Sequence, residues 1–213
     1  MCGNRQDLDH WRQTYAAVAR TTTLKVLLAL VAALDLECDQ ADVTTAFLNG
    51  VLDDDEIVYI RLPDGRIARL NKALYGLRRS PRLWYEELSR HLKAIGFLPI
   101  EADPCVFLRQ QDGSLILAYV DDIIFITRSS ASMRNVKEQF FSKYKYHDLS
   151  LISYYLGIRI RRDRSARLIE LSMEPYIDKL IQDFKRVDGF RRLTPFDTST
   201  IKLTLSTAEK IDS

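Results

Sequence analysis

The sequence lacks the cysteine pairs that would indicate a disulfide scaffold or a zinc site. It has three cysteines, Cys2, Cys38 and Cys105, and none of them belongs to a C-x-x-C pair or lies near a histidine at zinc-ligand spacing. Disulfide frameworks use even numbers of cysteines and form in oxidising compartments. We therefore expect a reduced, intracellular protein of the cytoplasm or nucleus.

Long hydrophobic segments and a strong charge imbalance are also missing. The first residues, "MCGNRQDLDHWRQ", are too polar for a secretory signal, and the longest apolar run, "LKVLLALVAAL", is too short to span a bilayer. The formal net charge of +2 is too small to indicate nucleic-acid or membrane binding by itself. We expect no membrane association.

Hydrophobic residues make up 46% of the 213 positions, which predicts one sizeable folded core. Helices are expected at residues 21–34, with Thr21 to Thr23 as N-cap candidates and Leu34 inward, at 81–96, at 133–144, and from about Pro175 with Ile177, Leu180, Ile181 and Phe184 inward. Strands are expected at residues 36–43, 56–62, 104–110, 115–120, 123–127, 154–162 and 167–172. This order predicts an α+β fold, with an antiparallel sheet covered by helices on one side.

Two adjacent carboxylates, Asp121 and Asp122, interrupt an otherwise apolar stretch, "LILAYVDDIIFIT". Adjacent negative charges at a tight turn repel each other, so local stability does not explain them. A divalent cation such as Mg²⁺ would, because hard ions prefer carboxylate oxygens held on a rigid turn. A solvent-facing acidic turn between two core strands is an equally good interpretation of this stretch alone.

A third carboxylate, Asp42, lies near the end of the strand before "TTAFLNG". If that strand neighbours the hairpin of Asp121 and Asp122, three carboxylates meet at one end of the sheet. Two metal ions about 3.5–4 Å apart, bridged by such a cluster, support in-line displacement at phosphorus. The sequence therefore indicates phosphoryl or nucleotidyl transfer.

Four segments in order resemble the reverse transcriptases of copia-type LTR retrotransposons, over about residues 12–197. They are "DVTTAFLNG", "LNKALYGLRRSPRLWY", "AYVDD" and "YYLGIRI". The resemblance implies RNA-dependent DNA polymerase activity on a right-hand polymerase fold. It implies a palm at about residues 21–172 with partial, truncated fingers, and the beginning of a thumb at 174–190. Residues 198–213, rich in Thr and Ser, are expected to form a tail or linker.

The resemblance also implies roles for individual residues. The catalytic and metal-binding residues would be Asp42, Asp121 and Asp122, with two Mg²⁺ ions, or Mn²⁺ in their place. The nucleotide-binding residues would be Phe47, Tyr75, Gly76 and Arg78. Phe47 would pack beneath the incoming sugar and exclude a 2′-hydroxyl, although an ordinary core aromatic is the alternative. Arg78 would meet phosphate, whereas without the motif it belongs to a solvated helix start.

Primer contacts are implied for three more residues, Tyr119, Leu156 and Gly157. Gly157 would permit a close approach of the primer backbone, with a β-bulge as the alternative interpretation. The arginines from Arg159 to Arg167 would flank the duplex. The histidines, including His147, are expected in solvated or satisfied positions.

The implied partners are an RNA template, a DNA primer and deoxynucleoside triphosphates. Family members belong to longer polyproteins with integrase and ribonuclease H, in virus-like particles of the cytoplasm or in the nucleus. Their sequence continues upstream of "QTYAAVAR" with basic finger strands that contact the incoming triphosphate. Because this sequence has no such strands there, we expect weak or no polymerase activity from it. Ala17 and Arg79 also depart from the family pattern, where proline and glutamine are common. The alternatives are a non-catalytic nucleic-acid-binding remnant and, less favoured, a palm-type cyclase.

Overall fold

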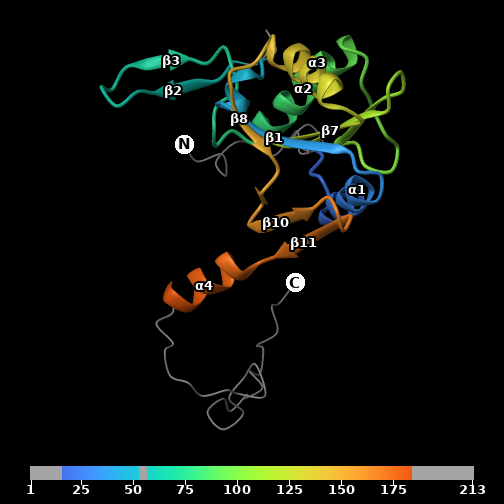
Figure 1. Cartoon of the computed structure of the whole chain (residues 1–213). Helices are drawn as coiled ribbons and strands as arrows, with labels where there is room; N and C mark the ends of the chain where they lie inside the picture. Colours follow the sequence, from blue (N-terminus) through green and yellow to red (C-terminus); the bar gives the residue numbers. More distant parts are fainter. Residues whose placement is uncertain (1–15, 53–56, 184–213) are drawn as a thin grey trace, which may run out of the picture. The chain divides into compact units, whose positions relative to one another are not determined.

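The structure is a computed structural model that describes residues 16–52 and 57–183. The chain divides into two units, Met1–Met173 and Glu174–Ser213. The first holds every strand and three α-helices of the described residues, whereas the second is represented by a single helix (Figure 1). Glu56 of the predicted strand at 56–62, Phe184 and the tail at 198–213 lie outside the described residues.

The fold is a mixture of helices and antiparallel strands. The helices are α1 (Thr21–Ala33), the 3₁₀ helix η3 (Ala46–Asn49), α2 (Ser80–Ala94), α3 (Ser130–Phe141) and α4 (Glu174–Asp183). The strands are β1 (Glu37–Val43), β2 (Tyr59–Arg61), β3 (Ile67–Arg69), β4 (Leu98–Pro99), β5 (Val106–Arg109), β6 (Ser114–Tyr119), β7 (Asp122–Thr127), β8 (Tyr146–Leu151), β9 (Tyr154–Tyr155), β10 (Ile158–Asp163) and β11 (Leu168–Ser172). They form sheets of order β4-β5-β6-β7-β1-β8, β11-β10-β9 and β2-β3. The predicted α+β class is thus supported.

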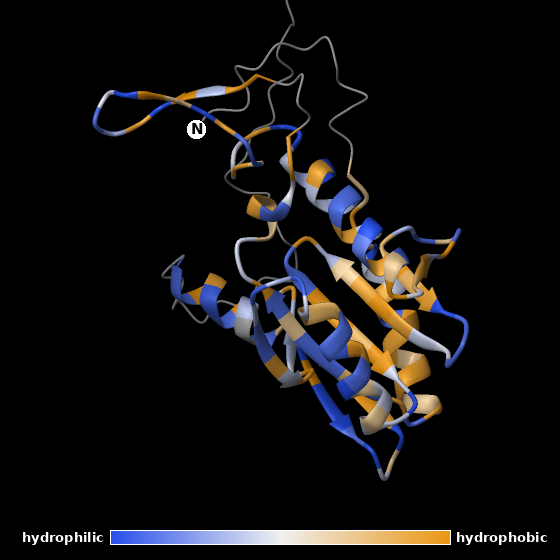
Figure 2. Cartoon of the chain, turned by 90° about the horizontal axis from the view of Figure 1, so that it is seen from above, coloured by the Kyte–Doolittle hydropathy of each residue, from blue (hydrophilic) through white to orange (hydrophobic). Residues whose placement is uncertain are grey.

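The six-stranded sheet is covered on both faces, which corrects the expectation of helices on one side only. Ile123 and Phe125 of β7 pack with α2 and α3, whereas Ile124 and Ile126 pack with α1 and the β9–β11 sheet. Successive side chains of a strand point to opposite faces, so an unbroken apolar run indicates burial on both. Figure 1 shows α2 and α3 on one side of the sheet and α1 with β10 and β11 on the other. Figure 2 shows hydrophobic residues concentrated in the middle strands and the helices against them.

Helix α1 begins as predicted at Thr21, but its N-terminus is satisfied differently. The N-cap residue is Arg20, and no side chain of the helix caps it. Instead, the Asp103 carboxylate accepts hydrogen bonds from the Arg20 N–H (3.2 Å) and the Thr23 hydroxyl (2.6 Å). Burial acts to raise the pKa of Asp103, but these bonds and one from the Cys105 N–H outweigh it and lower that pKa. A negative charge therefore lies at the positive end of α1.

Short-range signals elsewhere are confirmed. Helix α2 has Pro81 in its first turn, and its end is followed by Gly96 at φ +89°. The hairpin β5–β6 turns through residues 111–113, where Asp112 pairs with Arg109 at 2.7 Å. That hydrogen bond is the main reason that the pKa of Asp112 falls to about 2.

Four residues that were expected to point inward are exposed. Leu34 follows the end of α1 and is 63% exposed. In α4, the apolar side chains of Ile177, Leu180 and Ile181 are exposed among the described residues. Helical periodicity identifies an apolar face, but it does not say whether another element covers that face.

Candidate active site

The register of the six-stranded sheet brings the three predicted carboxylates to one place. Strands β1 and β7 are antiparallel, and Asp42 lies directly opposite Asp122. The Val43 N–H donates to the carbonyl oxygen of Asp121 at 2.8 Å, which ties the strand of Asp42 to the turn between β6 and β7. Tyr119 in turn lies opposite Asp122 on β6. Side chains opposite each other in a ladder share a face, so Tyr119, Asp122 and Asp42 form a row across three strands.

The electrostatics agree with this proximity. Burial is the largest influence that raises the pKa of Asp122, to about 6, and the negative charges of Asp121 and Asp42 add to it. The charges of Asp121 and Asp42 therefore disfavour the ionisation of Asp122. Within residues 16–52 and 57–183, no group of three or more His, Cys, Asp and Glu side chains is arranged as a preformed metal site. The donor set of half-buried carboxylates with mutual repulsion nevertheless fits a hard divalent cation, because such an ion supplies the missing positive charge.

The turn that carries Asp121 is strained. It consists of Val120 and Asp121, and Val120 has φ +56°. A β-branched residue rarely adopts a positive φ, and such strain costs of order 1–3 kcal/mol. The indole Nε1–H of Trp84 in α2 donates to the Val120 carbonyl oxygen at 2.6 Å. No local sequence pattern marks this hydrogen bond, because its two partners lie 36 residues apart in the chain.

Two predicted nucleotide-pocket residues contact each other beside the carboxylates. The rings of Phe47 in η3 and Tyr75 have centroids 4.6 Å apart. Partial burial raises the pKa of Tyr75, and the charges of Asp121 and Asp42 raise it further, which places Tyr75 within their electrostatic reach. Phe47 is half-buried at the margin of the core, so its interpretation as an ordinary core aromatic is only partly met.

Gly76 and Arg78 follow Tyr75 in the turn before α2. Gly76 is exposed with φ +96°, a conformation that glycine adopts without strain, and Arg78 is half-buried. The hydroxyl of Ser80 donates to the Leu74 carbonyl oxygen at 2.6 Å and so ties this turn to the start of α2.

Close packing joins η3 to the same helix. A Cβ atom on Gly50, directly after η3, would lie 3.0 Å from the Leu83 Cβ and 3.1 Å from the Trp84 backbone nitrogen. Glycine is favoured here by the limited space rather than by φ, which is −69°. Helix α2 thus supports Phe47 and the β6–β7 turn together.

Leu156 and Gly157, the predicted primer contacts, form the two-residue turn between β9 and β10. Both have positive φ, +47° and +82°. A Cβ on Gly157 would meet no atom of the protein within 4 Å, so glycine serves the turn conformation here, and the β-bulge interpretation is wrong. The turn adjoins the carboxylates through Tyr155, a buried residue whose hydroxyl donates to the Asp122 carbonyl oxygen at 3.4 Å.

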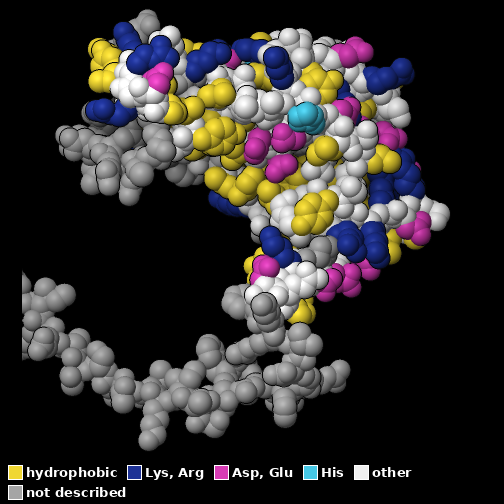
Figure 3. Space-filling model, turned by 90° about the vertical axis from the view of Figure 1, so that its left-hand side faces the viewer, with side chains coloured by type: hydrophobic (Ala, Val, Ile, Leu, Met, Phe, Trp, Pro, Cys, Tyr) yellow, Lys and Arg dark blue, Asp and Glu magenta, His cyan; other side chains and the backbone are white. Residues whose placement is uncertain are grey.

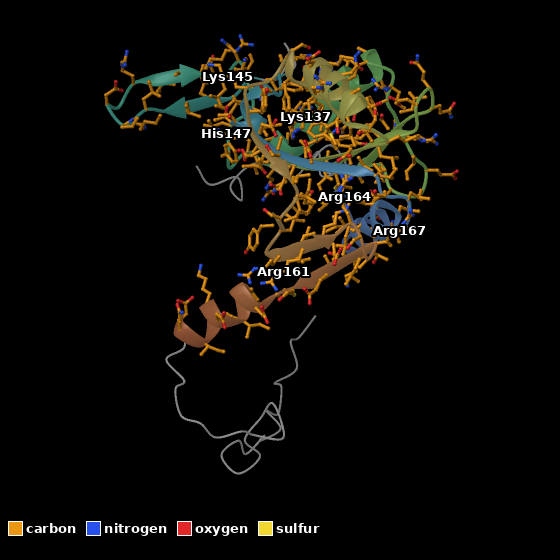
Figure 4. All side chains as sticks on the ribbon, in the orientation of Figure 1. Lys137, Lys145, His147, Arg161, Arg164 and Arg167 are labelled. Carbon is orange, nitrogen blue, oxygen red and sulfur yellow. The ribbon has the colours of Figure 1, made fainter. Side chains whose placement is uncertain are left out.

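His147 extends the row of the site by one strand. In the register of β1 with β8, it lies opposite Asp42, and it is exposed. Figure 3 shows a histidine at the edge of a group of acidic side chains, and Figure 4 labels His147 on this edge strand, near Lys145, which precedes the strand. A solvated or satisfied position was expected for the histidines, and the exposure of His147 agrees with this, but its place opposite Asp42 was not predicted.

Three of the arginines that were expected to flank nucleic acid form hydrogen bonds or ion pairs with other residues of the protein. Arg162 donates to the carbonyl oxygens of Leu36 (2.6 Å) and Val31 (3.3 Å) and to the Asp35 carboxylate (2.7 Å). Arg167 donates to the Ala33 carbonyl oxygen at 2.6 Å, and Arg164 pairs with Glu37. Figure 4 shows Arg164 and Arg167 beside α1. Arg162 and Arg167 bind carbonyl oxygens at or just after the C-terminus of α1, whereas Arg164 binds a carboxylate, so all three have partners within the protein.

Comparison with known proteins identifies the class. The family described as "Reverse transcriptase (RNA-dependent DNA polymerase)" matches residues 3–198. The chain therefore belongs to the reverse transcriptase family.

Its relatives specify the branch. It is similar to the "Retrovirus-related Pol polyprotein from transposon TNT 1-94" of Nicotiana tabacum, with 32% identity over 86% of this chain and 14% of the relative. The "Retrovirus-related Pol polyprotein from transposon RE1" of Arabidopsis thaliana is 31% identical over 97% of this chain and 14% of the relative. The chain is thus a copia-type reverse transcriptase domain, and it spans about 14% of the length of these two relatives. No helix in the described part of the chain is long and apolar enough to cross a bilayer.

Proposed function

We propose that this chain extends the 3′ end of a DNA primer on an RNA template, using deoxynucleoside triphosphates. One observation carries the proposal. Asp42 faces Asp122 across the β1–β7 ladder, and Asp121 occupies the adjoining turn. In a family of RNA-dependent DNA polymerases, such a corner is where nucleotidyl transfer would occur. The six-stranded sheet with its helices would be the palm, within residues 21–172, accompanied by partial fingers. Residues 174–190 would begin the thumb.

Asp42, Asp121 and Asp122 would hold two divalent cations, Mg²⁺ or Mn²⁺. When bound, these ions would supply the positive charge that favours an attacking primer oxygen and a departing pyrophosphate. The carboxylates would fix the position of that charge, and the sheet would fix the carboxylates. Positioning of this kind is the main contribution of the protein to phosphoryl transfer.

The aromatic pair would select the nucleotide. Phe47 and Tyr75 are in contact, and Tyr75 lies in the field of Asp121 and Asp42. A deoxyribose stacked on Phe47 would leave no room for a 2′-hydroxyl. Gly76 and Arg78 would complete the pocket, with the Arg78 guanidinium directed to phosphate or template backbone.

The primer would lie along the face that Tyr119 shares with Asp122. The Leu156–Gly157 turn would hold the primer strand, since Tyr155 anchors the start of this turn to the strand of Asp122. The chain would work as part of a longer polyprotein with integrase and ribonuclease H, inside the cell, in a cytoplasmic particle or the nucleus.

The test is incorporation of labelled thymidine nucleotide on a ribo-adenylate template with a short deoxy primer, with Mg²⁺ and with Mn²⁺. We expect Asp121→Asn to lower the rate by roughly 100-fold or more, since preorganised charge contributes about that much per group. Glu170→Gln is the matched control, because its carboxylate is exposed on β11 and pairs only at 4.0 Å with Arg161. It should leave the rate unchanged.

Binding of the template and primer, measured in parallel, distinguishes a polymerase from a non-catalytic nucleic-acid-binding protein. Under the polymerase proposal, Asp121→Asn lowers the rate of extension by roughly 100-fold or more while binding of the template and primer persists. A wild-type chain that binds the duplex without extending it, with binding equal or tighter in Asp121→Asn, would instead identify a non-catalytic nucleic-acid-binding protein. Removal of a negative charge near phosphate accounts for such tightening.

A further inference from the structure

The turn between β6 and β7 is held from three directions. The carbonyl oxygens of its two residues, Val120 and Asp121, and of Asp122 directly after it accept hydrogen bonds. The donors are Trp84 of α2, Val43 of β1 and Tyr155 of β9, at 2.6, 2.8 and 3.4 Å. Val43 and Tyr155 belong to strands that the turn already adjoins. Trp84 comes from the helix layer on the face of the sheet opposite to Tyr155, and it makes the shortest of the three bonds.

Trp84 is well placed to act as a fixed point. Its side chain is 2% exposed, and its ring packs edge-on against Tyr144 with centroids 5.2 Å apart. The tight contact of Gly50 with its backbone fixes it further. A donor that is buried and immobile loses little freedom when it makes a hydrogen bond, so it can hold its acceptor in a conformation that the acceptor does not prefer.

The conformation held is the unfavourable one at Val120, with φ +56°. Both γ-methyl groups of valine stiffen the backbone towards extended values, so the free turn would relax away from positive φ. Relaxation would rotate the following peptide and displace the Asp121 and Asp122 side chains from Asp42.

We propose that Trp84 is a positioning residue, whose indole N–H holds the strained Val120 turn so that Asp121 and Asp122 remain beside Asp42. The effect on catalysis rests on the proposed polymerase function. The effect on the turn does not. Trp84 touches no reacting atom in this account and acts only through the Val120 carbonyl.

The test is a double-mutant cycle of Trp84→Phe and Val120→Gly. Phenylalanine keeps most of the ring packing and removes the donor. Glycine adopts positive φ without strain, so a turn with glycine at position 120 needs no clamp. We expect Trp84→Phe to reduce kcat for primer extension about 10- to 100-fold, the size of effect that a misplacement of about 1 Å produces. In the Val120→Gly background, the same change should reduce kcat less than about threefold. KM for the nucleotide should stay within about twofold in all variants, because Phe47 and Tyr75 are untouched.

A second readout follows the turn without activity. The Val43 N–H bonds to the Asp121 carbonyl oxygen, so its hydrogen exchange reports whether the turn stays in place. Trp84→Phe should speed this exchange roughly tenfold, and Val120→Gly should restore it. If Trp84→Phe does not fold, tryptophan can be replaced throughout by benzothienylalanine, which has sulfur in place of the indole N–H. Trp11, the other tryptophan of the sequence, is first changed to phenylalanine so that only position 84 carries the analogue.

The outcomes separate the two proposals. If Trp84→Phe lowers both kcat and the protection of the Val43 N–H, and Val120→Gly restores both, the result supports the positioning role of Trp84 and the polymerase function. Loss and rescue of Val43 protection in a chain that extends no primer support the role of Trp84 and refute the polymerase proposal. If Trp84→Phe leaves both readouts unchanged, or if Val120→Gly rescues neither, the positioning role is overturned while the polymerase proposal stands on the Asp121→Asn result.

Discussion

Replacement of Arg162 by methionine tests whether the arginines after β9 stabilise the fold or bind nucleic acid. The Arg162 side chain is 14% exposed and donates to two carbonyl oxygens at the end of α1 and to Asp35. Hydrogen bonds from a charged donor contribute about 1.5–3 kcal/mol each. The bond to Val31 is long, at 3.3 Å, and Asp35 is 43% exposed, so only the bond to Leu36 counts in full. We expect the free energy of unfolding to fall by about 2–3 kcal/mol.

Urea unfolding followed by circular dichroism measures this change. With a slope of about 1–3 kcal/mol per molar urea, the midpoint should fall by roughly 1 M. The matched variant is Arg161→Gln, one residue earlier on the same strand, whose side chain is 65% exposed. It should change the free energy of unfolding by less than about 0.5 kcal/mol. Equal midpoints for wild type and Arg162→Met, or an equal loss in both variants, would refute the structural role assigned to Arg162.

Three further outcomes are expected. Asp112→Asn should lower the free energy of unfolding by about 2 kcal/mol, because a hydrogen bond from Arg109 is the chief reason that the pKa of Asp112 is lowered to about 2. This contribution is present above about pH 4 and is lost as the pH falls towards 2, which acid unfolding of wild type and variant would show. Phe47→Ala should raise ribonucleotide incorporation relative to deoxynucleotide incorporation, and an unchanged ratio in competition assays would contradict the sugar-selection role. Gly157→Ala should cost about 1–2 kcal/mol in thermal unfolding, because φ is +82° there, and should lower primer affinity.

The sequence was informative wherever the determinant is local. The turn through residues 111–113, the proline at the start of α2 and the glycine after its end each act over a few residues, and each was placed correctly. The meeting of Asp42 with Asp122 was also anticipated, although as a condition, because strand order cannot be derived from periodicity.

What the sequence could not supply depends on partners distant in the chain. Asp103 lies at the start of α1, and Trp84 reaches Val120, with no short motif to announce either contact. Arg162 belongs to a run of arginines that suggests a nucleic-acid surface, whereas in the fold it binds the carbonyl oxygens of Val31 in α1 and of Leu36 just after the helix. Charge patterns indicate which side chains are available, whereas only the fold decides what they satisfy.

The position of β1 between β7 and β8 has a consequence for biogenesis. Both neighbours of this strand are synthesised long after it, whereas β5, β6 and β7 pair with strands next to them in sequence. During translation, the segment of Asp42 must therefore wait for its first partner until residue 127 has emerged and for its second until residue 151 has emerged, and pairing of such distant strands is slow. A nascent chain stopped before β8 would present β1, the strand of Asp42, as the open edge of the sheet, and open strand edges are prone to aggregation.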